Sequence, residues 1–440
     1  MAAFTFKRGI HPPDHKESTN QKPIKILKPI GDLVFPMAQH IGAPCEPIVK
    51  KGDRVLLGQK IADSEAFVSS PIFSSVSGTV KSIEEVGHPN GFKCKGIVIE
   101  NDHLYEDHPS LNQSHDYKNM TNEEILAIIK NAGIVGMGGA TFPTHIKLAP
   151  PPDKEIDFII LNGAECEPYL TSDHRIMLEE TDRLIAGLKV LLSMFKEAKG
   201  IIGIESNKPD AIKKVTEAAK DEPRIEVITL HTKYPQGAEK QLIYAATKRE
   251  VPPGKLPFEV GCIVQNVDTI VAIHRAVDRG RPLTRRIVTV TGDAIKEPQN
   301  FKVRLGTSYK ELIEAAGGFV EEPAKIISGG PMMGFAMYSM DVPIIKGSSS
   351  ILCLTKKAIA TEDESNCMRC GKCVSACPMG LMPFELNKFA LAQVEEEFEA
   401  YKGMDCMECG ACSYVCPSKR HLLQSFRTTK KNILTNRRKS

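Results

Sequence analysis

The chain has 440 residues, 42% of them hydrophobic and 25% charged, and a net charge of +3 at neutral pH. This composition is typical of an ordinary globular protein, and the length predicts three or four domains. No apolar run approaches the roughly 18 residues that a membrane-spanning helix needs, and residues 1–15 lack an apolar signal core, so we expect a cytoplasmic protein.

The N-terminal part has the pattern of a β-rich domain. Residues 30–100 are predicted to form short strands of alternating hydrophobicity, separated by turns that contain glycine. The stretch resembles a biotinyl or lipoyl domain, a barrel-sandwich hybrid that presents a modified lysine at a hairpin tip. Here the matching segment is EAFVS and Val68 stands in place of the lysine, which excludes a carrier function. We expect this hybrid over residues 1–105 and a polar linker over 101–119.

Residues 121–280 alternate between helical and strand patterns. Thr121 and Glu124 form a capping-box signature ahead of a first apolar helix. Short apolar segments then alternate with amphipathic ones, and this alternation is typical of a parallel sheet covered by helices. The predicted strands are DFIIL, KGIIGI, RIEVITL and GCIVQN, and the predicted helices are TDRLIAGLKVLLSMF, KPDAIKKVTEAAK, AEKQLIYAAT and VDTIVAIHRAVDRG.

Three further segments follow the α/β region. Residues 285–335 return to mixed β-rich structure, for which we expect a small β-grasp-like domain. Residues 360–420 hold two cysteine motifs joined by the predicted helix PFELNKFALAQVEEEFEAYKG. Residues 421–440 form a basic tail that has no acid after Arg427. A solvated disordered tail and a contact with an anionic membrane surface or an acidic partner are both compatible with that charge.

The two cysteine motifs share the spacing C-x2-C-x2-C-x3-C-P. This spacing lets three thiolates converge on one [4Fe–4S] cluster, while the fourth cysteine, which precedes proline, binds the other cluster. Zinc is the alternative, but zinc sites usually use two separated pairs of ligands. The spacing therefore predicts one cluster held by Cys367, Cys370, Cys373 and Cys416, and a second held by Cys406, Cys409, Cys412 and Cys377.

A glycine-rich loop, GIVGMGGATFPTHIK, follows the first helix of the α/β region. Gly136, Gly138 and Gly139 would let the backbone approach a phosphate group, and Lys147 would neutralise its charge. The loop does not match the G-x-G-x-x-G dinucleotide fingerprint. On its own it fits a tight turn as well as a ligand-binding loop.

Polar side chains follow the predicted strands of the α/β region. The strand DFIIL ends in NGAECEP, which contains Asn162 and Glu167, and two later strands are followed by YPQGAEK and QNVDT. In open parallel sheets ligands bind at the carboxyl ends of the strands. We therefore expect Asn162, Tyr234, Gly237 and Asn266 to face a binding site, although the acids of NGAECEP also suit a solvated loop.

Together these motifs resemble the FMN- and NADH-binding subunit of respiratory complex I, which has G-R-G-G-A-G-F-P-T-G-x-K, N-A-D-E-G-E-P, Y-x-x-G-E-E and N-N-V-E-T. The whole order of segments, including the N-terminal GIHPPDHK and the paired cysteine motifs, resembles the C subunits of Rnf complexes. Rnf complexes are membrane-bound, ion-translocating ferredoxin:NAD+ oxidoreductases. The resemblance covers nearly the whole chain and implies an α/β multidomain protein.

The resemblance also implies roles for individual residues. The glycine loop and Lys147 would hold the phosphate of non-covalent FMN, and Asn162 and Asn266 its flavin or ribityl group. Phe142 matches a residue that stacks near the nicotinamide nucleotide. Three further residues match positions that contact the nucleotide or the flavin and are the candidate catalytic residues: Glu167, Tyr234 and Glu239. The chain departs from the complex I pattern at four positions, which makes the NADH contacts less defined: Met137, Ala164, Cys166 and Ala238.

The implied function is electron transfer between two [4Fe–4S] clusters, FMN and NAD(H). The implied partners are the other Rnf subunits, both membrane and iron–sulfur, with ferredoxin acting indirectly and no nucleic acid involved. The implied location is peripheral, on the cytoplasmic side of the cell membrane. Two alternatives are a cobalamin reductase of similar build and a non-catalytic electron-transfer scaffold without a working NADH site.

Overall fold

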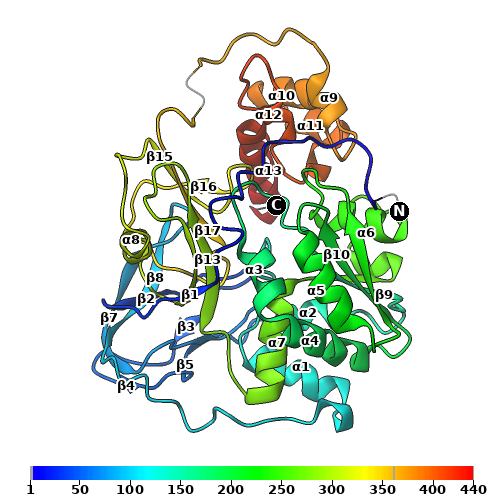
Figure 1. The fold of residues 1–440 in the computed structure, drawn as a ribbon. Helices are drawn as coiled ribbons and strands as arrows, with labels where there is room; N and C mark the ends of the chain where they lie inside the picture. Colours follow the sequence, from blue (N-terminus) through cyan, green and yellow to red (C-terminus); the bar gives the residue numbers. More distant parts are fainter. Residues whose placement is uncertain (1–2, 360–361, 440) are drawn as a thin grey trace.

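The computed structural model describes residues 3–359 and 362–439 of the chain. Figure 1 shows three regions: a β-rich part drawn in blue and yellow, an α/β part in green, and a small helical part in orange and red. The β-rich part combines the blue of the N-terminal strands with the yellow of β13–β17, because segments far apart in the sequence pair there.

The N-terminal strands form two small antiparallel sheets, as expected for the barrel-sandwich hybrid. One sheet has the order β2-β8-β7-β4 and the other the order β3-β5-β6. Val68 lies in the loop between β5 and β6, where its carbonyl oxygen accepts a bond from Ala43 N over 3.0 Å. The strands are β2 (Leu33–Pro36), β3 (Glu46–Pro47), β4 (Arg54–Val55), β5 (Lys60–Asp63), β6 (Ile72–Phe73), β7 (Gly78–Gly87) and β8 (Lys93–Asn101).

The α/β part has a parallel sheet of order β11-β10-β9-β12, which confirms the four predicted strands. The capping box of α1 is present, with Glu124 N donating to Thr121 Oγ1 and Thr121 N donating to Glu124 Oε2. Helix α3 was not predicted. The elements are η1 (Tyr117–Asn119), α1 (Asn122–Asn131), α2 (Thr144–Lys147), β9 (Phe158–Gly163), α3 (Ser172–Glu179), α4 (Thr181–Met194), β10 (Lys199–Glu205), α5 (Pro209–Ala219), β11 (Ile225–Leu230), α6 (Glu239–Thr247), η2 (Pro257–Val260), β12 (Cys262–Asn266) and α7 (Val267–Arg279).

A third sheet extends beyond the predicted β-grasp-like segment 285–335. Its order is β1-β14-β13-β17-β15-β16, so it takes one edge strand from the N-terminal segment and a central strand from beyond residue 335. Local patterns cannot reveal this, because pairing partners of β1 lie more than two hundred residues away. The elements are β1 (Lys25–Ile26), β13 (Arg285–Thr291), β14 (Gln299–Arg304), α8 (Tyr309–Ala315), β15 (Lys325–Ser328), β16 (Phe335–Ala336) and β17 (Ser350–Leu354).

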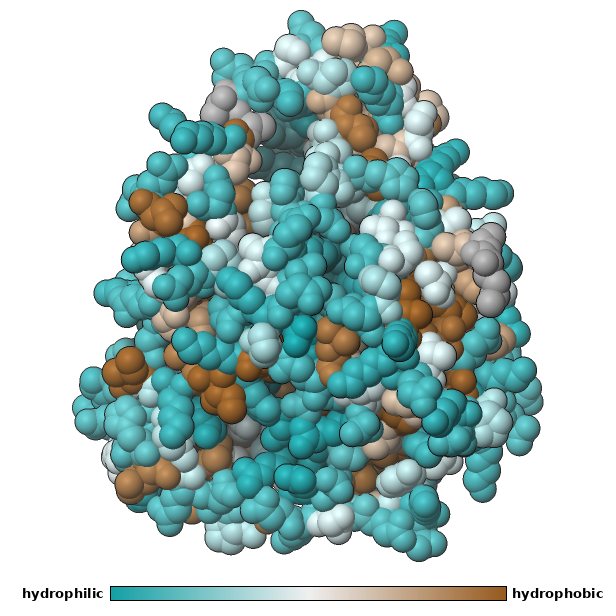
Figure 2. All heavy atoms as spheres, viewed as in Figure 1, coloured by the Kyte–Doolittle hydropathy of each residue, from teal (hydrophilic) through white to brown (hydrophobic). Residues whose placement is uncertain are grey.

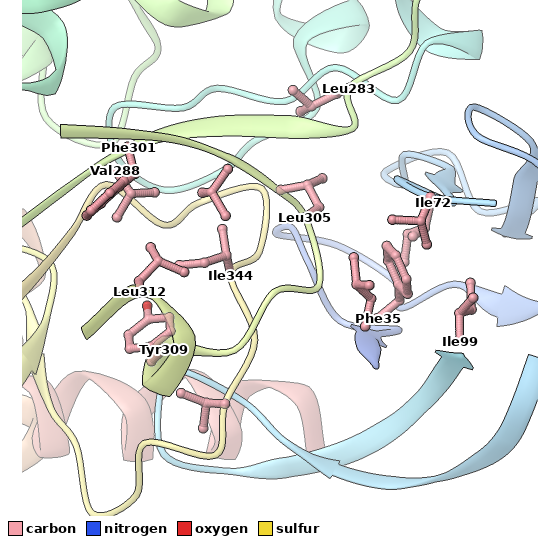
Figure 3. Close-up of a cluster of buried hydrophobic side chains, with 14 of the residues drawn as sticks. Phe35, Ile72, Ile99, Leu283, Val288, Phe301, Leu305, Tyr309, Leu312 and Ile344 are labelled. Atoms are coloured by element: carbon pink, nitrogen blue, oxygen red, sulfur yellow. The ribbon is translucent and has the colours of Figure 1, made fainter. Parts of the chain in front are cut away.

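The barrel and the third sheet share one hydrophobic core. Phe35 and Ile99 of the barrel belong to the same buried cluster as Val288 and Phe301 of the third sheet, and all four are at most 1% exposed. Figure 3 shows these side chains facing a common interior. The barrel and the third sheet therefore pack as one body, because each buries its apolar face against the other.

The N-terminal segment before β1 ties the α/β part to the helical part. Phe4 forms a bridge with Leu230 at the end of β11, and Ile10 forms one with Tyr234. Gly9 N donates to the carbonyl oxygen of Ala376 in the helical part over 3.3 Å. This segment is the dark blue coil that runs between the green and orange regions in Figure 1.

The C-terminal part differs from the prediction in two ways. The single helix expected between the cysteine motifs is two helices, interrupted at Gln393, which has a left-handed φ of 58°. The basic tail is not irregular, since α13 packs Leu422, Phe426 and Ile433 into the domain core. The elements are α9 (Lys372–Ala376), α10 (Pro383–Leu391), α11 (Glu395–Ala400), η3 (Gly403–Asp405), α12 (Ala411–Tyr414) and α13 (Leu422–Lys439).

The surface view in Figure 2 shows mainly hydrophilic residues on this face, with hydrophobic ones in small separate groups. Among the described helices, none combines the length and the apolar character needed to cross a membrane.

Candidate functional site

The carboxyl ends of β9 and β12 place two predicted amide side chains next to each other. Asn162 and Asn266 are partners in the parallel ladder, at the edge where such sheets bind ligands. Asn162 Nδ2 donates to the carbonyl oxygen of Gly237 over 2.7 Å, and Asn266 Nδ2 donates to Asp173 Oδ2 over 2.7 Å. A Cβ atom added to Gly237 would lie 3.2 Å from Asn162 Oδ1. The structure thus brings three of the predicted site residues together.

The glycine-rich loop borders the same edge of the sheet. Gly136 N donates to the carbonyl oxygen of Phe142 over 2.9 Å, which closes the loop on itself. A Cβ atom added to Gly138 would lie 2.7 Å from Asn266 Nδ2, so a larger residue there would displace the Asn266 side chain. Gly138 and Gly139 are exposed, and apart from Gly139 and its two chain neighbours no described residue has an atom within 4 Å of a Gly139 Cβ position. Exposed glycine amides at this edge suit a phosphate group.

Met137, at the centre of the loop, is held from two sides. Its backbone N–H donates to Thr269 Oγ1 over 3.0 Å, and its carbonyl oxygen accepts from Arg286 Nη2 over 3.1 Å. Arg286 lies on β13 and also pairs with Asp268. The sequence does not indicate Arg286 as a contact of the loop, although Met137 replaces the loop arginine of the complex I pattern. The loop itself has no arginine, and the third sheet therefore supplies one, Arg286, to the loop backbone.

Lys147 and Glu239 meet across the site. The Lys147 Nζ atom lies 2.5 Å from Glu239 Oε1, and both side chains are partly exposed. Lys147 ends α2 and Glu239 begins α6, so the pair joins the two helices that flank the strand ends. A ligand phosphate at the loop would compete with Glu239 for the lysine.

The two carboxylates of NGAECEP have separate structural partners. Glu165 accepts bonds from the backbone N–H groups of Asp173 and His174, at the N-terminus of α3. Glu167 accepts bonds from Met332 N and Met333 N, which lie between β15 and β16. Burial raises the pKa of Glu167 to about 7, although the two amide bonds oppose the rise. A nucleotide role for Glu167 stays a prediction, and its carboxylate is already engaged by the third sheet.

Tyr234 connects the strand-end site to the second cysteine motif. The side chain is 1% exposed, and its hydroxyl donates to the carbonyl oxygen of Cys409 over 2.7 Å. Burial raises the pKa of Tyr234 above its usual value, so the hydroxyl keeps its proton. Ile10 of the N-terminal segment pairs with the Tyr234 backbone in both directions over 2.8 Å. The candidate catalytic tyrosine therefore lies at a junction of three parts of the molecule.

Lys16 is a site residue that sequence reasoning missed. Its Nζ atom donates to the carbonyl oxygens of Glu165, Glu167 and Leu170, although it is only 5% exposed. Burial lowers its pKa. The residue stands in GIHPPDHK, a motif with no mechanistic signal of its own. A cavity of about 170 Å³ adjoins it, lined by residues that include His11, Asp14, Cys166, Glu205 and Tyr234.

The second cysteine motif is largely buried, and Cys377 of the first motif lies beside it. Cys377 lines one pocket together with Cys406, Cys409 and Cys412. Burial raises the pKa of Cys406 to about 11 and that of Cys409 to about 12, and the neighbouring thiols add to both shifts. Thiols so placed ionise readily only when they bind a metal centre. These four residues fit the cluster for which their spacing predicts them.

The first cysteine motif is more open. Cys367 and Cys370 are exposed, whereas Cys373 is 9% exposed, and burial, with a smaller contribution from nearby Cys416, raises the pKa of Cys373. Among residues 3–359 and 362–439, no group of three or more His, Cys, Asp or Glu side chains is arranged to hold a single metal ion. In a [4Fe–4S] cluster each thiolate binds a different iron. The ligand set of each cluster stays a prediction that rests on spacing and on these contacts.

Four protein-family descriptions match the chain in order. They are the RnfC barrel sandwich hybrid domain at residues 4–104, the Nuo51 FMN-binding domain at 129–275, the SLBB domain at 287–336 and the 4Fe-4S dicluster domain at 366–420. This order confirms the expected fold class. Among solved structures, an air-oxidised NAD+-reducing [NiFe]-hydrogenase matches 73% of this chain and 62% of its own, with 18% identity and a TM-score of 0.50. That likeness concerns the fold alone.

Curated relatives match almost end to end. The C subunit of the Na+-translocating ferredoxin:NAD+ oxidoreductase complex of Acetobacterium woodii is 49% identical over 99% of this chain and 98% of its own length. The C subunit of the proton-translocating ferredoxin:NAD+ oxidoreductase complex of Clostridium ljungdahlii is 53% identical over 97% of this chain and 93% of its own. The chain therefore belongs to the RnfC family, the C subunits of ion-translocating oxidoreductase complexes.

Proposed function

We propose that this chain is the FMN- and NAD(H)-binding electron-transfer subunit of a membrane-bound, ion-translocating ferredoxin:NAD+ oxidoreductase. The observation that carries the proposal is the direct contact between its two candidate sites. The Tyr234 hydroxyl, at the strand-end site, donates to the Cys409 carbonyl oxygen over 2.7 Å. Electron transfer needs such proximity between the flavin-binding part and a cluster-binding loop.

Residues of the α/β part would bind and orient the flavin. Exposed amides of Gly138 and Gly139, with Lys147, would hold the phosphate, while Asn162 and Asn266 would orient the ribityl chain or the ring. When bound, FMN supplies hydride exchange with NAD(H) and single-electron exchange with iron–sulfur clusters. The protein positions these groups and keeps water from the buried junction around Tyr234.

The remaining candidate residues have narrower proposed roles. Phe142 would stack near the nicotinamide nucleotide, Gly237 would allow close approach of the backbone, and Glu239 would orient Lys147. Two [4Fe–4S] clusters would be bound by interleaved cysteines. The cluster of the buried second motif would lie next to the flavin domain, and that of the exposed first motif would face the other subunits. The proposed ligands are Cys367, Cys370, Cys373 and Cys416 for one cluster, and Cys406, Cys409, Cys412 and Cys377 for the other.

A cofactor and activity assay of the purified protein tests this proposal. We expect about eight iron atoms and one non-covalent FMN per chain, as two [4Fe–4S] clusters require, and reduction of an artificial dye by NADH. Clusters without flavin and without NADH-dependent dye reduction would indicate a non-catalytic scaffold. Faster reduction of cobalamin than of the dye would favour the cobalamin-reductase alternative.

The proposed location is the cytoplasmic face of the cell membrane, through other Rnf subunits. Helix α13 is basic, but Arg427 and Lys430 already pair with Glu408 within the protein, which weakens their attraction to anionic lipid. At about 1 M salt the Debye length falls to about 3 Å, so lipid contacts would be screened. We expect the protein to stay on membranes that contain the other subunits under these conditions. Release by salt would show that the basic helix dominates the attachment.

A further inference from the structure

The backbone of the loop between β15 and β16, residues 329–334, is hydrogen-bonded to the carboxylate of Glu167. Met333 N donates to Glu167 Oε1 over 2.8 Å, and Met332 N donates to Glu167 Oε2 over 3.1 Å. A Cβ atom added to Gly330 would lie 2.3 Å from Glu167 Oε2, so the loop backbone sits directly on the carboxylate. The two amides bind both oxygens of one carboxyl group, and such hydrogen bonds are strongest when that group is ionised.

The other side of the same loop touches the second cysteine motif. A Cβ atom added to Gly410 would lie 3.0 Å from the Met332 carbonyl oxygen, which places the loop against the turn between Cys409 and Cys412. Arg427 of α13 donates to the Met333 carbonyl oxygen over 3.2 Å and pairs with Glu408 over 3.3 Å. The loop is therefore held between the end of β9 and the cluster-binding domain.

We propose that Glu167 is a positioning residue that seats the cluster-binding domain on the flavin-binding domain through the 329–334 loop. The inference rests on the proposed function. It adds the loop that sets the distance between the flavin site and the cluster of the second cysteine motif. Electron transfer slows steeply as that separation grows, so a loosened loop would slow the transfer. Direct binding of nucleotide by Glu167 would require both carboxylate oxygens to leave their amide partners.

The test compares two substitutions of acids in the cofactor-loaded protein. Glu167→Gln removes the charge and leaves one oxygen for two amides, whereas Glu239→Gln removes an acid that contacts Lys147 instead. One NADH is oxidised to NAD+ with release of a proton and two electrons. Each of the two clusters accepts one of these electrons. Rapid mixing with NADH under anaerobic conditions follows flavin and cluster absorbance separately, and hydrogen exchange follows the amides of residues 325–340.

For Glu167→Gln we expect faster exchange at Met332 and Met333, an unchanged KM for NADH, and cluster reduction slowed about tenfold by misplacement of the domain. For Glu239→Gln we expect the opposite pattern, an altered affinity for FMN through Lys147 with unchanged amide exchange at residues 325–340. Unchanged exchange in Glu167→Gln, or unchanged cluster reduction, would overturn the inference. A raised KM with normal exchange would make Glu167 a nucleotide ligand.

A second variant approaches the same contact from the loop side. Gly330→Ala keeps Glu167 but introduces a methyl group 2.3 Å from the present position of Glu167 Oε2, closer than the two atoms can approach. It should reproduce the faster exchange and slower cluster reduction, and normal cluster reduction in it would contradict the inference even if Glu167→Gln fails to fold. Failure of the proposed function is recognised separately, because wild-type protein would then contain no flavin that NADH reduces.

Discussion

Lys147 is the cationic side chain through which the glycine-rich loop is predicted to hold FMN. It already pairs with Glu239 over 2.5 Å, so Lys147→Ala removes a phosphate ligand and leaves an unpaired acid beside the loop. A hydrogen bond to a charged group contributes about 2 kcal/mol, and we therefore expect FMN to bind more than tenfold more weakly. The measurement is the ratio of flavin to iron after dialysis. Iron content should not change, and full retention of flavin at low FMN concentration would contradict the assignment.

Lys16 makes a second prediction at the scale of single residues. Its ammonium group donates to three backbone carbonyl oxygens of the loop that follows β9. Lys16→Met would leave these buried acceptors without a donor, at a cost of about 3 kcal/mol in the free energy of unfolding. Lys22→Met is the matched control, because Lys22 is exposed and its ammonium group donates to the Pro298 carbonyl oxygen at the surface. The midpoints of urea denaturation measure both, and equal shifts would exclude a special role for Lys16.

Some site residues could be predicted from the sequence and others could not. Asn162 and Asn266 were predictable because each directly ends an apolar strand, and parallel pairing then brings strand ends together. Lys16 and Arg286 were not, because their partners lie far away in the sequence. Glu167 was placed at the correct strand end, but its contact with the third sheet depends on how separate domains dock.

At the scale of elements, the parallel strands followed from short apolar runs, whereas α3 was missed. Helix α3 buries His174 and Arg175, which sequence patterns assign to the surface, and it pairs these residues with Asp210 and Glu179. The helix in the basic tail was hidden for the opposite reason. Its buried residues Leu422, Phe426 and Ile433 are spaced as on one face of a helix. The surrounding basic residues, however, favour the prediction of a solvated segment.

The cysteine motifs carry a prediction about how two loops share ligands. Cys377 lies in the pocket of Cys406, Cys409 and Cys412, so Cys377→Ser should perturb the cluster of the second motif. Cys416→Ser should reciprocally perturb the cluster of the first motif, because serine is a poorer ligand for iron than thiolate. Electron paramagnetic resonance of the two reduced variants distinguishes the clusters. If each substitution alters the cluster of its own motif, the interleaved arrangement is wrong.

At the scale of the whole molecule, the N-terminal segment and the third sheet join parts that are distant in the sequence. The segment before β1 contacts the end of β11 and the helical part, and β1 completes the edge of the third sheet. Sequence patterns divide the chain into domains because they detect only local periodicity. In the folded chain the flavin-binding part contacts the N-terminal segment on one side and the third sheet on another.

The core shared by the barrel and the third sheet gives the last prediction. Phe301 is 1% exposed and lies in β14, yet it belongs to the same buried cluster as Phe35 of β2 (Figure 3). Phe301→Ala should lower the free energy of unfolding by about 4 kcal/mol, as expected for a large cavity in a packed core. Because the core is shared, amides of β2 and β8 should lose protection from hydrogen exchange together with those of β13. Phe67→Ala, at a side chain that is 82% exposed, is the control and should change neither quantity. Loss of protection confined to the third sheet would show that the barrel folds independently.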